Sequence, residues 1–125
     1  WFPTLAEWTG AKIPKGHHLD GQSIAKVVED PKASTPHQKY YWQLGNRNNQ
    51  WVVREGDWKL YAKARENVRP KGIPEMTKED KKQFLVNLSK DPGEKRNWAG
   101  DHPAELKRLQ ELAKKYQDDL ASSAK

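Results

Sequence analysis

The chain has 125 residues with six Trp, four Tyr and two Phe, which is enough for one folded domain and argues against disorder. It contains no cysteine, which excludes disulfides, thiolate chemistry and cysteine-ligated metal sites. No apolar run approaches the roughly 20 residues that cross a bilayer, and no signal peptide is recognised, so we expect no membrane partner and leave the compartment open.

The formal net charge of +6 favours acidic partners such as nucleic acid or sulfated glycans. The basic residues are interspersed with acidic ones, however, as in residues 77–82 and 105–119. Such mixing is typical of a solvated surface. Nucleic acid is therefore not favoured as a partner.

The beginning of the chain predicts two short helices. Phe2, Leu5 and Trp8 recur at helical spacing and predict a first helix that buries one face. Asp20 is a possible N-cap for a second helix, which should end before Pro31 because the residue preceding proline avoids the helical conformation.

Four later segments concentrate β-favouring residues and predict strands. A turn is predicted at residues 45–49, and Gly56 should set the turn of a hairpin because glycine readily takes a positive φ. Residues 63–83 are charged, broken twice by proline and poor in apolar residues, which predicts a surface excursion. A type II turn is predicted at Pro92 and Gly93. The predicted strands are residues 39–44, 50–55, 57–62 and 84–88.

The end of the chain carries the clearest helical pattern. Asp101 or His102 as the cap and Pro103 in the first turn precede an amphipathic helix of about five turns. Packed on the strands, this helix predicts an α+β fold, a four-stranded antiparallel sheet with a long C-terminal helix lying on it. The predicted apolar stripe consists of Leu106, Leu109, Leu112, Ala113, Tyr116 and Leu120.

Two adjacent histidines, His17 and His18, precede Asp20 and resemble a partial zinc or manganese site. Adjacent histidines on an extended segment point in opposite directions, so the metal interpretation is not favoured. They stay candidates for hydrogen-bonding a ligand at the edge of a cleft. No G-x-S-x-G nucleophile motif and no glycine-rich phosphate loop is present, so we expect no catalytic residue and no metal site in this segment.

The tryptophans Trp42, Trp51 and Trp58 allow two interpretations. The favoured one places them in the core beneath the last helix, with Trp58 and Leu60 facing it, because a small sheet must bury large side chains. The other is a basic, aromatic face that stacks on bases or sugar rings. The cations near such a face are Arg47, Arg54, Lys59, Lys63 and Arg65.

Four separated stretches, in order, resemble the C-terminal part of the sulfatases, the type I enzymes that use a formylglycine. Residues 1–24 are similar to the family's D-x-x-P-T-L helix with its connector and L-D-G-x-S-L. Residues 52–62 resemble R-x-G-x-W-K-L, and residues 84–103 resemble L-Y-D-L-x-x-D-P-x-E-x-x-N-L-A-x-x-x-P, before a final amphipathic helix. Asn87 replaces the family's usual Asp and Trp98 its common Leu, both in positions suited to packing.

The resemblance implies an alkaline phosphatase-like parent with a large α/β catalytic domain and a smaller C-terminal subdomain. It implies that residues 1–30, with the two short helices, end the catalytic domain and that residues 37–125 form the subdomain. The family's C-x-P-x-R or S-x-P-x-R nucleophile motif, its calcium ligands and its catalytic Lys and His have no counterpart in this sequence. Calcium and formylglycine are therefore expected in the parent enzyme alone.

As an arylsulfatase-like sulfuric ester hydrolase, the parent would act on a sulfate ester, and its N-terminal catalytic domain would be the partner of this segment. The segment alone is expected to be inactive, and the family suggests a periplasmic or extracellular location. The candidate substrate-binding residues are His17, His18, Trp42 and Arg47. The alternative function is a free-standing basic and aromatic module that binds sulfated glycan or nucleic acid.

Overall fold

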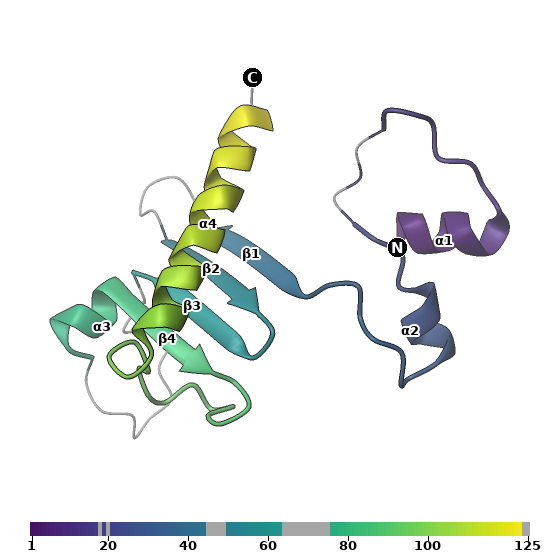
Figure 1. The fold of residues 1–125 in the computed structure, drawn as a ribbon. Coiled ribbons are helices and arrows are strands. Elements are labelled where there is room, and N and C mark those ends of the chain that lie inside the picture. The colour runs from purple at the N-terminus through teal and green to yellow at the C-terminus, as the bar shows by residue number, and fades with distance from the viewer. Residues whose placement is uncertain (18, 20, 45–49, 64–75, 124–125) are drawn as a thin grey trace. The chain divides into compact units, whose positions relative to one another are not determined.

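The computed structural model describes residues 1–17, 19, 21–44, 50–63 and 76–123. The chain divides into two compact units, Trp1–Gln38 and Lys39–Lys125. The first unit is helical, and the second contains a sheet with a long helix on it (Figure 1).

Helix α1 of the first unit spans Phe2–Thr9 and ends at Gly10, whose φ of 69° lies in the left-handed region that glycine tolerates. The prediction that Phe2, Leu5 and Trp8 form a buried face is wrong for this chain. These three residues are between 44% and 58% exposed. The residues that α1 buries within this unit are Thr4 and Ala6.

Helix α2 spans Ala25–Glu29 and ends before Pro31, as predicted. Asp20 lies outside the described residues, and its predicted role as N-cap is wrong because the helix begins only at Ala25. At the N-terminus of α2, two backbone N–H groups donate instead to side-chain hydroxyls, one from a neighbouring residue and one from α1. Hydroxyl oxygens of Ser23 and Thr4 accept hydrogen bonds from the N–H groups of Ala25 and Ile24, at 3.2 and 3.1 Å.

The second unit is built on a four-stranded antiparallel sheet with the order β1-β2-β3-β4. The four predicted strands are confirmed, with small shifts at their ends. Gly56 has a φ of 57° in the turn between paired residues Glu55 and Trp58, as predicted. The strands are β1 (Lys39–Leu44), β2 (Gln50–Glu55), β3 (Trp58–Ala62) and β4 (Gln83–Asn87).

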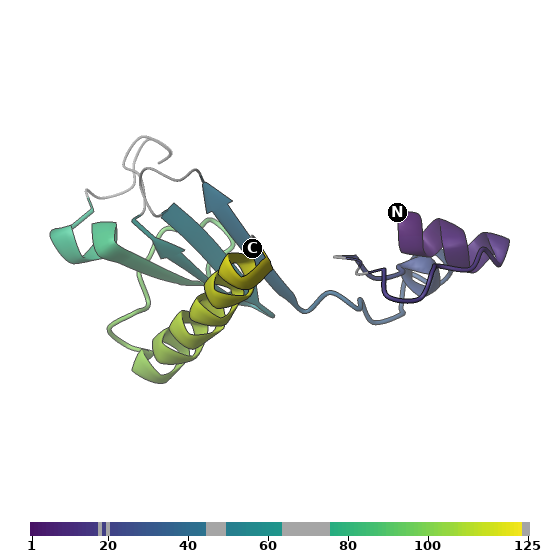
Figure 2. The same ribbon diagram turned by 90° about the horizontal axis from the view of Figure 1, so that it is seen from above.

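Helix α4 spans Pro103–Ser123 and lies across one face of the sheet, as the two views show (Figures 1 and 2). Trp58 and Leu60 face this helix, as predicted, while Leu120 at the end of the predicted stripe is exposed. Among the described helices, none combines the length and the hydropathy that crossing a membrane requires. The core between helix and sheet consists of Val53, Leu60, Leu85, Leu109 and Ala113.

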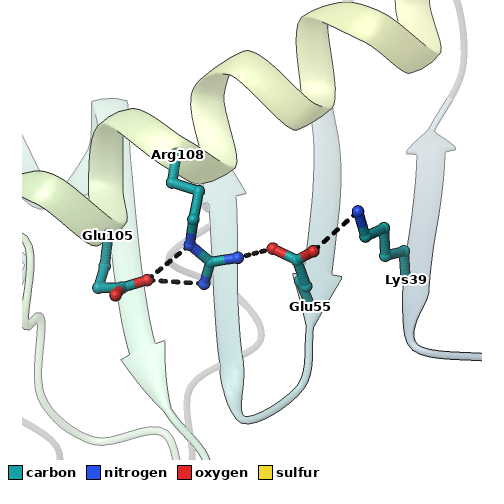
Figure 3. A network of polar contacts seen from close by, with 4 residues as sticks. All are labelled: Lys39, Glu55, Glu105 and Arg108. Carbon is teal, nitrogen blue, oxygen red and sulfur yellow. Dashed lines mark hydrogen bonds and ion pairs between the residues drawn. The ribbon is translucent and has the colours of Figure 1, made fainter.

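A network of charged side chains joins α4 to the ends of two strands (Figure 3). The Arg108 guanidinium on α4 contacts Glu55 on β2 and, at 2.6 Å, Glu105 one turn earlier. Glu55 also pairs with Lys39 Nζ on β1 at 3.0 Å. These side chains are between 23% and 51% exposed, so the network fixes the position of α4 more than it adds free energy.

The opposite face of the sheet carries a second, smaller core of Met76, Phe84 and Val86. Because successive side chains of a strand point to opposite faces, Phe84 and Val86 face this core while Leu85 between them faces α4. The smaller core covers the β3–β4 half of this face.

The predicted surface excursion over residues 63–83 is wrong for its last part. Met76 is buried, and Lys78–Lys82 form helix α3. Thr77 and Asp80 make a capping box, in which each side chain accepts a hydrogen bond from the other residue's N–H. This T-x-x-D pattern is a helix-start signal that the charge of the segment obscured. Residues 64–75, and the turn predicted at 45–49, lie outside the described residues.

The turn after β4 is not the predicted type II turn. The Asp91 carbonyl accepts a hydrogen bond from the Glu94 N–H at 3.0 Å, so Pro92 and Gly93 do occupy the middle of a turn. Type II requires a positive φ at Gly93, but the residue with positive φ is Glu94, at 52°.

Asn97 fastens the same loop to the outer edge of β4. Its Oδ1 accepts hydrogen bonds from the N–H groups of Leu85 and Ala99, both at 3.0 Å. Its Nδ2 donates to the Gln83 carbonyl at 3.0 Å and to Asp80 Oδ1 at 2.6 Å. One amide side chain thereby satisfies two backbone groups of an edge strand and connects that strand to α3.

Candidate functional site

The β1–β2 half of the sheet face opposite α4 is open to solvent and carries aromatic side chains. The Trp42 side chain is 48% exposed and stacks on Tyr40, with ring centroids 5.6 Å apart and planes inclined by 8°. The prediction that Trp42 belongs to the core beneath α4 is wrong, because strand alternation places it on the other face. Trp51 and Trp58 do pack against that core.

Arg54 is the cation of this open surface. It lies opposite Tyr40 in the β1–β2 register, and its Cζ is 5.9 Å from the centroid of the Tyr40 ring. Its Nε donates a hydrogen bond to the Gly56 carbonyl at 2.8 Å, which fixes the guanidinium over the hairpin. Among the described residues, no carboxylate pairs with Arg54. We call Tyr40, Trp42 and Arg54 the open aromatic surface.

A second polar group lies on the adjoining strand of the same face. Lys59 Nζ is 2.9 Å from Glu94 Oε1, and the Tyr61 hydroxyl donates a hydrogen bond to Glu94 Oε2. Lys59 Nζ also lies 4.7 Å from the centroid of the Tyr61 ring. This arrangement holds Glu94 in its left-handed backbone conformation and compensates the charge of Lys59.

Both titrating donors of this group hold their protons firmly. Burial by itself would lower the pKa of Lys59, but its hydrogen bonds to Tyr61 and Glu94 outweigh burial and raise the pKa above the ordinary 10.5. Burial, together with the hydrogen bond to Glu94, raises the pKa of the Tyr61 phenol above the ordinary 10.0. Neither group is therefore tuned to transfer a proton near neutral pH.

The free energy of unfolding is expected to decrease as pH rises above about 10. Lys59 and Tyr61 both bind their proton more tightly in the folded chain than in the unfolded chain. Their contribution to the free energy of unfolding is therefore complete below the ordinary pKa values, and it is lost as pH rises through the raised pKa values of the folded chain. Urea unfolding at about pH 8 and about pH 11 measures the loss. Tyr61→Phe should lose less stability between these conditions, and an equal loss in both proteins would contradict the assignment to Tyr61.

The structure describes two of the four residues predicted to bind substrate. His17 is exposed in the connector of the first unit, and Trp42 is on the open aromatic surface of the second. His18 and Arg47 lie outside the described residues, as does Arg65 of the predicted basic face. The substrate-binding role of His17, His18, Trp42 and Arg47 stays a prediction.

Sequence reasoning missed Glu94, which neutralises Lys59 and removes it from the set of free cations on this face. The available signal was Glu94 in the turn segment D-P-G-E, because a carboxylate in a turn can pair with a cation of a hairpin. No spacing rule, however, links residues 35 positions apart.

No metal centre is assembled from the part of the chain that the structure describes, because nowhere in it do three or more His, Asp or Glu side chains come together. A calcium ion requires about six oxygen ligands. The described residues therefore do not fit calcium.

No protein-family model matches the chain, and no curated protein matches it. Solved structures do. A Bacteroides thetaiotaomicron structure labelled BT33336S-sulf, from work on the metabolism of multiple glycosaminoglycans, is 26% identical with a TM-score of 0.63, covering 94% of this chain and 24% of that one. BT1596, a 2-O GAG sulfatase, is 24% identical with a TM-score of 0.52, covering 98% of this chain and 24% of that one.

The chain matches the C-terminal region of a sulfatase. The resemblance drawn from the four sequence motifs is thereby confirmed. BT4656, solved in complex with its substrate D-glucosamine-2-N,6-O-disulfate, shares the fold of this chain at 19% identity and a TM-score of 0.62, covering 93% of this chain and 22% of that one. The chain spans about a quarter of the length of the solved structures that it matches.

Proposed function

We propose that this chain acts as part of a larger sulfatase, a sulfuric ester hydrolase, in which it braces the catalytic domain and contributes to the substrate cleft. The observation that carries the proposal is the extent of the fold match. It covers 94% of this chain but 24% of the solved structure, so the remaining three-quarters of such an enzyme would hold the catalytic residues. The formylglycine nucleophile and the calcium ion would belong to that remainder.

The first unit supports a bracing role through the exposed face of α1. Phe2, Leu5 and Trp8 share that face, and such a row of large apolar side chains is typical of a surface that packs against other protein. In the proposed enzyme, its occupant is the rest of the catalytic domain, of which residues 1–30 would be the last part. Residues 37–125 would form the separate C-terminal subdomain.

The substrate class that we propose is a sulfated sugar. The matched structures include a 2-O GAG sulfatase and a protein solved with D-glucosamine-2-N,6-O-disulfate. His17, His18, Trp42 and Arg47 are our candidates for residues that border the cleft. The isolated chain is expected to release no sulfate, because its sequence has no nucleophile motif.

The test uses the larger protein that contains this chain, and it measures inorganic sulfate released from D-glucosamine-2-N,6-O-disulfate and from a 2-O-sulfated glycosaminoglycan. Release from either one is expected, with none from the isolated chain. Leu5→Asp should lower the Tm of the larger protein by about 5 °C or more, because it would bury an unpaired carboxylate. The same substitution should leave the Tm of the isolated chain unchanged, since Leu5 is exposed there.

Lys12→Asp is the matched control, because it also places a carboxylate at an exposed position of the first unit. Its Tm should equal that of the unmodified larger protein. Absence of sulfate release by the larger protein would refute the sulfatase assignment. Equal Tm values for Leu5→Asp and Lys12→Asp would refute the bracing role of α1.

A further inference from the structure

The open aromatic surface differs in two respects from the β3–β4 half of the same sheet face. The half of this face over β3 and β4 is covered by the smaller core, whereas Trp42 over β1 is 48% exposed. The Trp42 and Tyr40 rings are held nearly parallel by stacking, so the exposed indole is presented in a fixed orientation. Exposed aromatic surface in a fixed orientation is typical of a place where a ligand binds.

Among the described residues of this face, Arg54 is an uncompensated cation. Arg54 and Lys59 face each other across β2 and β3, but Glu94 neutralises Lys59 at 2.9 Å. Arg54 has no carboxylate partner among the described residues, and its hydrogen bond to the Gly56 carbonyl uses Nε alone. Its two terminal nitrogens therefore remain available to an oxyanion, which a guanidinium binds through two parallel hydrogen bonds.

A ligand that satisfies both features needs an apolar ring face beside an anionic oxygen group. The Tyr40 ring centroid lies 5.6 Å from the Trp42 ring centroid and 5.9 Å from Arg54 Cζ, so the indole and the guanidinium adjoin the same phenol ring. A sulfated pyranose has this composition, because C–H groups line its ring faces and the sulfate projects from its rim.

We propose that Trp42 and Arg54 form a binding subsite for a sulfated sugar residue, with the sugar ring against the Trp42 indole and the sulfate on the Arg54 guanidinium. Tyr40 positions both side chains. The choice of a sulfated sugar over a nucleotide, which also joins a ring to an oxyanion, rests on the proposed function. The subsite thus gives the larger enzyme a contact to a sugar of its glycan substrate.

The test is binding of D-glucosamine-2-N,6-O-disulfate to the 125-residue chain, followed through the indole N–H signals in two-dimensional NMR. We expect one indole signal to shift on titration and to be the one missing from Trp42→Ala. Trp42→Ala and Arg54→Gln should each weaken binding by about tenfold, as losing a stacked ring or a charge-assisted hydrogen bond does. Trp42→Phe should retain part of the affinity. Arg54→Lys should bind more weakly than the unmodified chain, because lysine cannot donate two parallel hydrogen bonds to a sulfate.

Matched controls are Trp1→Ala and Lys115→Gln, which remove an exposed indole and an exposed cation elsewhere. Both should bind like the unmodified chain, and the desulfated sugar should bind at least about tenfold more weakly. A loss of affinity equal in the controls and in the Trp42 and Arg54 variants would overturn the proposal. Binding of a single-stranded oligonucleotide in place of the sulfated sugar would overturn it in favour of nucleic-acid recognition.

Kinetic measurements on the larger protein distinguish failure of this proposal from failure of the proposed function. If it releases sulfate and Trp42→Ala raises the KM for a sulfated glycan with little change in kcat, both proposals stand. If the larger protein releases sulfate and Trp42→Ala changes neither its kcat nor its KM, the subsite is refuted while the sulfatase assignment stands. If the larger protein releases no sulfate but the chain loses sugar binding in the two variants, the subsite stands and the sulfatase assignment is refuted.

Discussion

Replacing Leu109 with alanine is expected to lower the free energy of unfolding of this chain by about 2–5 kcal/mol, the range for removing a fully buried leucine. Leu109 is 0% exposed and packs against Leu60 and Leu85, where α4 crosses the sheet. The alanine would leave a cavity between two rigid elements that cannot close around it. Since a domain is stable by about 5–15 kcal/mol in total, this substitution removes a large share. Urea unfolding followed by far-UV circular dichroism measures the change.

Leu120→Ala is the control on the same helix. Leu120 belongs to the same predicted stripe but is 51% exposed, so its replacement should change the free energy of unfolding by less than about 0.5 kcal/mol. Equal destabilisation by the two substitutions would mean that α4 does not lie on the sheet with Leu109 inward.

Asn97→Ala is expected to cost about 2–4 kcal/mol, although it removes only a polar side chain. It would leave the N–H of Leu85, a fully buried residue, and the Gln83 carbonyl without their present partners. An unpaired buried backbone group costs about 1–3 kcal/mol, and Asn97 serves two of them in β4. The loop after β4 and helix α3 would also lose their shared contact through Asp80.

The control for Asn97 is Gln43→Ala, which removes an exposed amide with one hydrogen bond, at 3.3 Å, from the Tyr41 hydroxyl. Its effect should stay within about 0.5 kcal/mol. Hydrogen exchange gives an independent measurement, because the Leu85 amide should exchange much faster in Asn97→Ala than in the unmodified chain. Unchanged protection of that amide would contradict the assigned role.

Periodicity predicted α4, because this helix buries one face and exposes the other, and β-favouring residues with their turn signals predicted the strands. The alternation of Trp58 and Leu60 with Lys59 determined which strand residues meet the helix. The same rule, applied to β1, puts Tyr41 and not Trp42 toward α4, so the alternation contained the correct placement of Trp42. The expectation that large aromatic side chains are buried overrode it.

Other features depend on contacts that no periodicity encodes. The buried position of Met76 and the start of α3 arise where a charged segment returns to the sheet, and only the capping box at Thr77 gave a local signal. The role of Asn97 was not predicted, because three of its four hydrogen bonds are to backbone groups. Backbone partners leave no trace in the side-chain pattern.

The sequence predicted the types of residue at the candidate site, aromatic and basic, but not which individual residues form it. Sequence reasoning gave a basic, aromatic face as the alternative to a core, and the structure places Trp42 and Arg54 on the open aromatic surface. Lys59 is removed from the free cations by Glu94, which lies 35 positions away. Charge pairing over such a separation is a property of the folded chain, so a count of local cations overestimates the charge that a ligand meets.

The loop after β4 also determines how this chain behaves toward other copies of itself. The outer edge of an edge strand is a template on which a second chain can add a strand, and this is a route to aggregation. The outward carbonyls of β4 are already used: Gln83 accepts from Asn97, Leu85 from the Trp98 N–H at 2.8 Å, and Asn87 from the Lys90 and Asp91 N–H groups at 3.2 and 2.8 Å. This edge is therefore closed to strand addition by the chain's own loop, without the edge lysines or prolines that many sheets use for that purpose.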